Sequence, residues 1–181
     1  MRGLHQLAAV AVFPLAVLLA NSTLAQEVAS LTVSSAAFEH EGTLPKKYSC
    51  DGDGVSPPLT VSNIPANAKT LVLIHDDPDA PSGTWMHWLL YDLPVTGTTV
   101  TLAEAAPKEA VWADGTMQGR NGWGDAKYGG ACPPDGTHRY FFKFYALDTQ
   151  LNLKKKRSLW KVRKAMKKHI IAKGELMASY P

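Results

Sequence analysis

The segment 138–147 alternates between two sets of side chains, as a long β-strand does. One face carries Tyr140, Phe142, Phe144 and Ala146, and the other carries Arg139, Phe141, Lys143 and Tyr145. Because aromatic residues occupy both faces, we expect this strand to be covered on both sides or to border a pocket. A sheet should therefore organise the domain.

Three shorter β-rich runs support this interpretation. They are Leu31–Phe38, Leu71–His75 and His87–Leu93, and each is flanked by Gly, Pro, Asp or Asn. Long irregular stretches at Tyr48–Leu59 and Trp112–Gly136 separate the strands. Loops of this length inside a compact domain are usually functional, so we expect them to contribute to a site.

Only the last thirty residues have helical spacing. After Ser158, a candidate N-cap, apolar residues recur at Leu159, Val162, Met166, Ile170 and then Leu176 or Met177. The chain has an ordinary globular composition, with 45% hydrophobic and 19% charged residues. We therefore predict one compact domain of mainly β (α+β) class with a C-terminal helix.

The first 25 residues have the layout of a secretory signal peptide. One arginine lies in Met1–Gln6, Leu7–Ala20 has no charge, and small residues precede a cleavage position after Ala25. The apolar run is shorter than the roughly 20 residues of a membrane-spanning helix. We predict a signal peptide at 1–25, a domain at 26–181, and a periplasmic or secreted location. An uncleaved N-terminal anchor is the alternative.

Export bears on the two cysteines, Cys50 and Cys132, which are the only ones in the chain. Both lie in loops rich in Gly, Pro and Asp, where a thiol has little reason to be buried. In an oxidising compartment such a pair is most simply a disulfide. A structural zinc site is disfavoured because the two residues lack close spacing.

Three polar clusters lie at the ends of predicted strands, at 76–81, 85–88 and 136–140. Together they contain aspartates, two histidines, a tyrosine and tryptophans. An aspartate that orients an imidazole, within apolar walls, would form a small pocket whose His and Tyr donors suit a phosphate or carboxylate group. The alternative is structural, since Asp before Pro commonly caps a turn and a lone His often only packs.

Motifs of common catalytic sites are absent from the sequence. It has no Gly-x-Ser-x-Gly elbow, no His-Glu-x-x-His, no phosphate-binding Gly-Lys-Ser/Thr loop and no Rossmann glycine fingerprint. We therefore predict a protein that is not an enzyme and needs no cofactor or metal. Two His and one Asp could bind zinc with an open position for water, which leaves an Asp/His-dependent hydrolase as the least favoured alternative.

Five motifs, in order between about Phe38 and Leu147, carry a family resemblance. They are Tyr48-Ser49-Cys50-Asp51-Gly52 with Ser56-Pro57-Pro58-Leu59, Asp77-Pro78-Asp79-Ala80-Pro81, Trp85-Met86-His87-Trp88, Ala131-Cys132-Pro133-Pro134-Asp135-Gly136, and Gly136-Thr137-His138-Arg139-Tyr140. The chain resembles the phosphatidylethanolamine-binding protein family, and within it the bacterial Raf-kinase-inhibitor-like branch. The resemblance implies an antiparallel β-sandwich-like fold with a small pocket for phosphate-like or carboxylate ligands.

Carried over position by position, the implied ligand-binding residues are Asp77, Trp85, His87, Pro133, His138 and Tyr140. Arg139 is implied to pair with a carboxylate of the motif. Two positions depart from the family pattern. Val61 stands where a Trp is expected, which affects packing, and Cys132 stands where eukaryotic relatives have Gly. A Cys50–Cys132 disulfide would brace the rim of the pocket.

The resulting expectation is an exported protein that binds a small anion or a phospholipid head group. The alternative from another class is an inhibitor of a kinase or protease that acts through the surface around the pocket. Family resemblance transfers fold and pocket better than biological role, so both hypotheses stay open at this point.

The formal net charge of +3 hides a strong asymmetry. Residues 26–153 hold eight Lys/Arg against fifteen Asp/Glu, whereas residues 154–181 hold ten against one. We predict that this basic segment contacts an anionic membrane or partner through Lys154, Lys155, Lys156, Arg157, Lys161, Lys164 and Lys168, of which the last three share one helical face. The alternative is that the apolar helical face packs on the domain and the lysines are solvated. Nucleic acid is not an expected partner.

Overall fold

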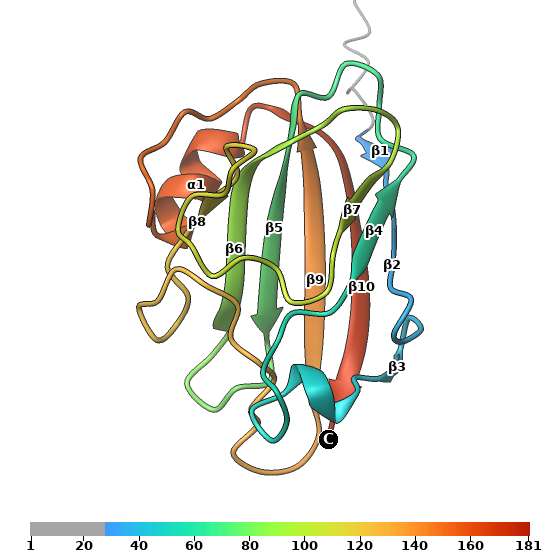
Figure 1. The fold of residues 1–181 in the computed structure, drawn as a ribbon, viewed down its shortest axis with the longest axis vertical. Helices are drawn as coiled ribbons and strands as arrows, with labels where there is room; N and C mark the ends of the chain where they lie inside the picture. The colour runs from blue at the N-terminus through green and yellow to red at the C-terminus, as the bar shows by residue number, and fades with distance from the viewer. Residues whose placement is uncertain (1–27) are drawn as a thin grey trace, which may run out of the picture.

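Strands make up most of the regular structure of residues 28–181, the part of the chain that the computed structural model describes (Figure 1). The elements are β1 (Ala29–Ser30), β2 (Thr32–Ser34), β3 (Gly42–Thr43), the 3-10 helix η1 (Lys46–Tyr48), β4 (Leu59–Ser62), β5 (Thr70–Asp77), β6 (Trp85–Pro94), β7 (Val100–Leu102), β8 (Met117–Gln118), β9 (His138–Leu147), α1 (Leu159–Met166) and β10 (Ile170–Tyr180). The mainly-β, α+β class is confirmed. The predicted signal peptide lies outside the described residues.

The larger sheet has the strand order β1-β10-β9-β5-β6-β8, and β3 also pairs with β10. Strand β9 has the predicted bounds and lies near the centre, between β10 and β5, with both of which it pairs antiparallel. Strands β1 and β3 are short and pair parallel with β10. Strand β5 also pairs antiparallel with β6, so that β6 and β9 both begin at the end of the sheet where β5 ends.

A second sheet, with the order β2-β4-β7, faces the inner side of the larger one. Leu59 and Val61 of this sheet belong to the same buried core as Leu73, Phe142 and Phe144 of the larger sheet. Val61, at the position where the family resemblance implies a Trp, is 1% exposed and packs in this core. The departure at position 61 therefore concerns packing.

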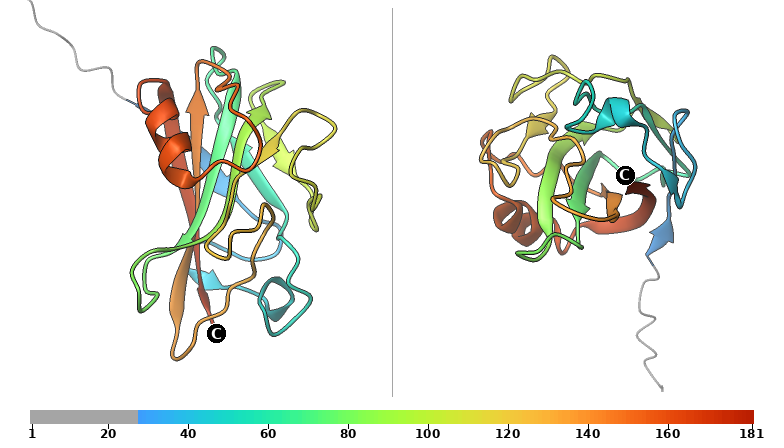
Figure 2. Two further views of the ribbon diagram at one scale, coloured as in Figure 1. Left: turned by 90° about the vertical axis from the view of Figure 1, so that its left-hand side faces the viewer. Right: turned by 90° about the horizontal axis from the view of Figure 1, so that it is seen from below.

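Helix α1 covers the outer side of the larger sheet (Figure 2). Val162 and Met166 are buried against Val72 and Ile74 of β5. The apolar face of the helix thus packs on the domain, as the alternative interpretation of the basic segment predicted. Within residues 28–181 no helix combines the length and the apolar character needed to cross a bilayer.

The prediction that the helix continues to Leu176 or Met177 is wrong. The helix begins after Ser158 as expected but ends at Met166, and the chain then forms strand β10, so that Lys168 and Ile170 lie outside the helix. The strand has period-two burial, with Ala172, Leu176 and Ala178 buried. Pairing with β9 on one edge and with β1 and β3 on the other outweighs the helical spacing of a few apolar residues.

Candidate functional site

Strand β5 ends where β6 and β9 begin, at the lower end of the sheet in Figure 1. Asp77 is the last residue of β5 and pairs across the sheet with Trp85, the first residue of β6. His138 is the first residue of β9. Because β5 is antiparallel to both neighbours, residues far apart in the sequence lie side by side at one end of the sheet. Pro78 follows Asp77 and ends the strand there.

A β-bulge in β6 sets the direction of His87. Asp76 pairs with Met86 and His75 pairs with Trp88, so that His87 is the extra residue between two paired positions. Trp88 is buried in the core between the sheets, and His87 lines a hollow beside it. Without the bulge, two adjacent residues of one strand would point to opposite sides.

Asp77 and His138 form a buried pair. The Nδ1–H of His138 donates to Oδ2 of Asp77 at 2.8 Å, and the side chains are 7% and 4% exposed. The backbone N–H of Asp79 donates to the other carboxylate oxygen, Oδ1, at 2.8 Å. Both oxygens of Asp77 therefore accept a hydrogen bond from the protein, and the imidazole of His138 has a defined tautomer and orientation.

Asp79 and Arg139 form a second pair beside the first. The Arg139 guanidinium donates through Nε and Nη2 to the two oxygens of Asp79 at 2.9 and 2.7 Å. These hydrogen bonds lower the pKa of Asp79 to about 2. Arg139 therefore pairs with a carboxylate of the motif, as the resemblance implied, and its charge is compensated there.

The imidazole of His87 is held by the loop that follows β8. Its Nδ1–H donates to the carbonyl oxygens of Gly129 and Gly130, each at 3.1 Å. Burial holds the pKa of His87 below its ordinary value of 6.5. The neutral ring therefore carries its proton on Nδ1 and has a lone pair on Nε2, the nitrogen left for a ligand.

Tyr140 and His75 lie behind His87. The Tyr140 ring is perpendicular to the His87 ring with centroids 5.3 Å apart, and the His75 ring is also 5.3 Å away. The Tyr140 hydroxyl is buried near Asp77 and the backbone of Cys132, but forms no hydrogen bond of good geometry among the described residues. Burial raises the pKa of Tyr140. It is thus a neutral phenol with an unused donor.

A hollow of about 160 Å³ opens in front of these side chains. Its lining consists of Asp77, Ala80, Pro81, Ser82, Trp85, His87, Trp123, Cys132 and Pro134. The rings of Trp85 and Trp123 meet edge to face with centroids 5.5 Å apart and form its walls. Glycine is required behind both walls, because a Cβ at Gly122 would overlap the Trp85 ring and one at Gly129 would overlap the Trp123 ring.

The structure brings most of the sequence-derived site residues together, in two layers. Asp77, Trp85 and His87 line the hollow, while His138 and Tyr140 lie behind them. Pro133 is not part of the lining, and its neighbour Pro134 takes that place.

Sequence reasoning missed Trp123, which is 51% exposed at the mouth of the hollow. The available signal was an aromatic residue between two glycines in the long loop 112–136 that was expected to be functional.

The predicted disulfide between Cys50 and Cys132 is confirmed. It joins the segment after η1 to the loop that carries Cys132, and the N–H of Cys50 also donates to the carbonyl of Ala131 at 2.9 Å. Since Cys132 lines the hollow, the bond braces one side of it.

No three His, Cys, Asp or Glu side chains within residues 28–181 are arranged to hold one metal ion. The ring nitrogens Nδ1 of His87 and His138 both make hydrogen bonds within the protein. The two histidines and the aspartate that could have bound zinc according to the sequence therefore do not form a metal site in residues 28–181.

The fold and site define a class of protein: a mainly-β domain with a buried Asp–His pair and a second histidine at one end of its larger sheet. Solved structures share the architecture. A phosphatidylethanolamine-binding protein homologue from Chlamydia trachomatis is 43% identical, with a TM-score of 0.75 over 84% of this chain and 97% of that one. E. coli YbcL, described as a new member of the mammalian PEBP family, is 32% identical, with a TM-score of 0.72 over 84% and 98%.

Sequence comparison agrees. A UPF0098 protein of Methanothermobacter thermautotrophicus is 43% identical over 150 residues, which cover 83% of this chain and 98% of that protein. The family model described as phosphatidylethanolamine-binding protein matches residues 34–181. The chain therefore belongs to the phosphatidylethanolamine-binding protein family.

Proposed function

We propose that the hollow binds a small ligand with a phosphate or carboxylate group, and that binding places a proton on His87. The observation that carries the proposal is the fixed tautomer of His87, whose Nδ1–H donates to the carbonyls of Gly129 and Gly130. An anionic oxygen that reaches Nε2 needs a donor there. Only the protonated imidazole supplies one.

The charge of Asp77 does not prevent this binding. Both of its oxygens already accept hydrogen bonds, from His138 and from the backbone of Asp79, so the carboxylate is partly compensated before a ligand arrives. The Tyr140 hydroxyl is a second unused donor near the same carboxylate. Donors and apolar walls together are what a small anionic head group requires.

The size of the hollow restricts the ligand. Its volume of about 160 Å³ is below the roughly 300–1,000 Å³ of sites that enclose a drug-sized molecule. It therefore accommodates a phosphate or carboxylate group with a few attached atoms, and the indoles of Trp85 and Trp123 contact the carbon atoms. The same hollow suits the head group of a phospholipid, with the acyl chains outside.

A titration with dimethyl phosphate at two pH values tests the proposal, because this diester keeps one negative charge throughout. Burial lowers the pKa of the free His87 imidazole and a bound anion raises it, so binding takes up a proton and the affinity increases as the pH falls. One proton gives at most about tenfold per pH unit. Calorimetry in two buffers of different ionisation enthalpy counts that proton directly.

Variants of the pocket sharpen the test. His87→Asn keeps an amide donor for the carbonyls of Gly129 and Gly130 but lacks Nε2, and Asp77→Ala removes the group that orients His138. Both should lose binding while the far-ultraviolet spectrum of the fold is retained. His169→Ala, an exposed histidine outside the pocket, is the matched control and should bind normally. Unchanged affinity in His87→Asn, or equal affinity at both pH values, would overturn the proposal.

We further propose that the protein acts outside the cytoplasm, in the periplasm or as a secreted protein. The disulfide supports this location, because such bonds persist mainly in oxidising compartments. Inhibition of a kinase or protease and an Asp/His-dependent hydrolysis stay hypotheses from the sequence.

A further inference from the structure

The cations of the basic segment lack acidic partners. Residues 154–173 contain ten Lys and Arg and no Asp or Glu. None of these ten side chains takes part in an ion pair with any residue in 28–181, whereas Lys47, Arg139 and Lys143 elsewhere all do. The positive charge around α1 is therefore available to an external partner.

One aromatic side chain stands among these cations. Trp160 of α1 is 65% exposed, although the helix buries Val162 and Met166 beneath it. The ammonium of Lys164 lies 5.2 Å from the centre of the Trp160 ring. Arg163 and Lys167 follow Trp160 at helical spacings of three and seven residues, so that they share its strip of the helix surface.

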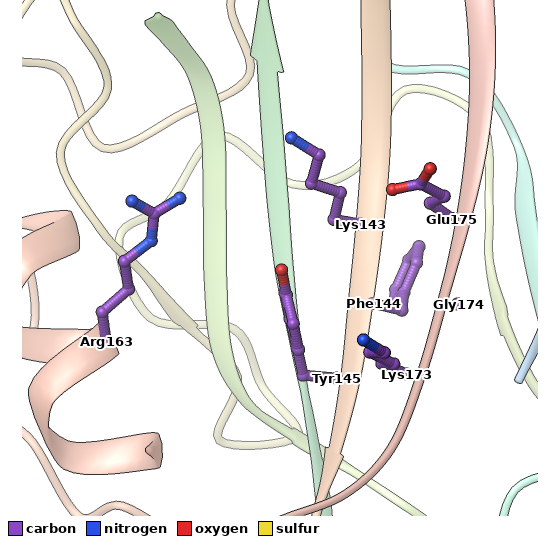
Figure 3. A pocket seen from close by; sticks show the side chains of 7 residues that line it. All are labelled: Lys143, Phe144, Tyr145, Arg163, Lys173, Gly174 and Glu175. Atoms are coloured by element: carbon purple, nitrogen blue, oxygen red, sulfur yellow. The ribbon is translucent and has the colours of Figure 1, made fainter. Parts of the chain in front are cut away.

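The strip continues onto the outer face of the larger sheet. Figure 3 shows Arg163 reaching from α1 toward a hollow of about 400 Å³, with Tyr145 on β9 and Lys173 on β10 around it. Lys143 at the same hollow is neutralised by Asp76 at 2.7 Å, and Glu175 adds one negative charge. The cations of this hollow without an ion-pair partner among residues 28–181 are thus Arg163 and Lys173.

We infer that this surface docks on an anionic phospholipid bilayer. We call it the basic face and define it by Trp160, Arg163, Lys164, Lys167 and Lys173. Unpaired cations complement the negative potential of such a bilayer, and an amphipathic indole ring fits the head-group level of the interface. A protein partner is less well matched, because protein interfaces are depleted of lysine, and Lys164, Lys167 and Lys173 belong to the basic face.

The docking is peripheral and electrostatic. Since Val162 and Met166 are committed to the core, the helix cannot insert its apolar side as a free amphipathic helix does. The inference does not rest on the proposed function of the pocket, which is lined by residues at the end of β5 and the start of β6, whereas the basic face lies on α1 and on the outer side of the larger sheet.

Co-sedimentation with vesicles tests the inference. The mature protein should bind vesicles of equal parts phosphatidylglycerol and phosphatidylcholine and leave pure phosphatidylcholine vesicles unbound. Each cation near the surface contributes about fivefold to binding, so Lys164→Glu/Lys167→Glu should lower the partition coefficient at least about 25-fold. Trp160→Ala should weaken vesicle binding several-fold. About 1 M salt should abolish binding, because the Debye length falls to about 3 Å.

The matched control is Lys46→Glu/Lys108→Glu. It makes the same change of net charge at two exposed lysines outside the basic face and should keep near-normal vesicle binding. A loss as large as that of Lys164→Glu/Lys167→Glu would show that only net charge matters and would overturn the inference. Equal binding to both vesicle types would overturn it as well. So would binding to soluble polyglutamate without binding to vesicles, which would instead indicate an acidic protein partner.

Discussion

His75 should make the stability of this protein depend on pH in a defined way. Its ring is fully buried and stacks on Phe142 with centroids 4.0 Å apart. The Nδ1–H donates to the carbonyl of Phe141 at 3.0 Å, while Nε2 finds no hydrogen-bond partner among the described residues. Burial, and then the neighbouring His87, hold the pKa of His75 well below 6.5. The folded protein therefore keeps this ring neutral.

The sign of the effect follows from where the proton binds. In the unfolded chain His75 takes up a proton as the pH falls through 6.5, and in the folded protein it does not until a much lower pH. Stability is therefore highest above pH 6.5 and decreases below it. One proton that binds only to the unfolded chain lowers the free energy of unfolding by up to about 1.4 kcal/mol for each pH unit. This is a substantial part of the roughly 5–15 kcal/mol by which a domain is stable.

Urea unfolding at several pH values above and below 6.5 measures this slope in the wild type and in His75→Asn. The Asn amide can still donate to the carbonyl of Phe141 but does not titrate. Above pH 6.5 the variant will be less stable than the wild type because it leaves a cavity, so the test compares slopes. The free energy of unfolding of the variant should fall less steeply below pH 6.5, by up to one proton. Parallel slopes would refute the reasoning.

Two further predictions concern export and its consequences. Cys50→Ser/Cys132→Ser should lower the free energy of unfolding by about 4 kcal/mol in urea titrations, because the bond closes a loop with a sequence separation of 82 residues; an unchanged midpoint would contradict this. N-terminal sequencing of the protein recovered from an exporting bacterial cell should begin at Gln26, after cleavage behind Ala25, and protein that keeps Met1 would count against export.

Parts of the fold could be predicted because their signals are local. In strand β9 the residues 139–146 alternate between two faces, and the predicted bounds of the strand are those observed. The start of α1 after Ser158 is equally local. Strand β10 was missed because Ile170 continues the four-residue helical spacing of Val162 and Met166, although the helix ends at Met166. Gly174 marks the difference, since its neighbour is the backbone of Leu31, 143 residues away in sequence, and a Cβ there would overlap it.

Some residues of the candidate site could likewise be predicted from local patterns, and others could not. Asp77 and His138 could be grouped because both lie at strand ends, and the antiparallel topology then brings them to 2.8 Å. The bulge that turns His87 toward the hollow depends on the register between β5 and β6, which no local pattern specifies. Trp123 reaches the hollow only because glycines behind the aromatic walls leave room for the rings.

The two proposed sites draw positive charge from different sources. The residues that line the hollow include no Lys or Arg, so its charge must come from a proton on an imidazole. The basic face carries exposed lysine and arginine side chains, so its charge does not come from a histidine. Binding in the hollow should therefore follow pH and respond little to salt, whereas docking should follow salt and ignore pH. A phosphate compound whose binding is abolished by salt but unchanged by pH would belong to the basic face.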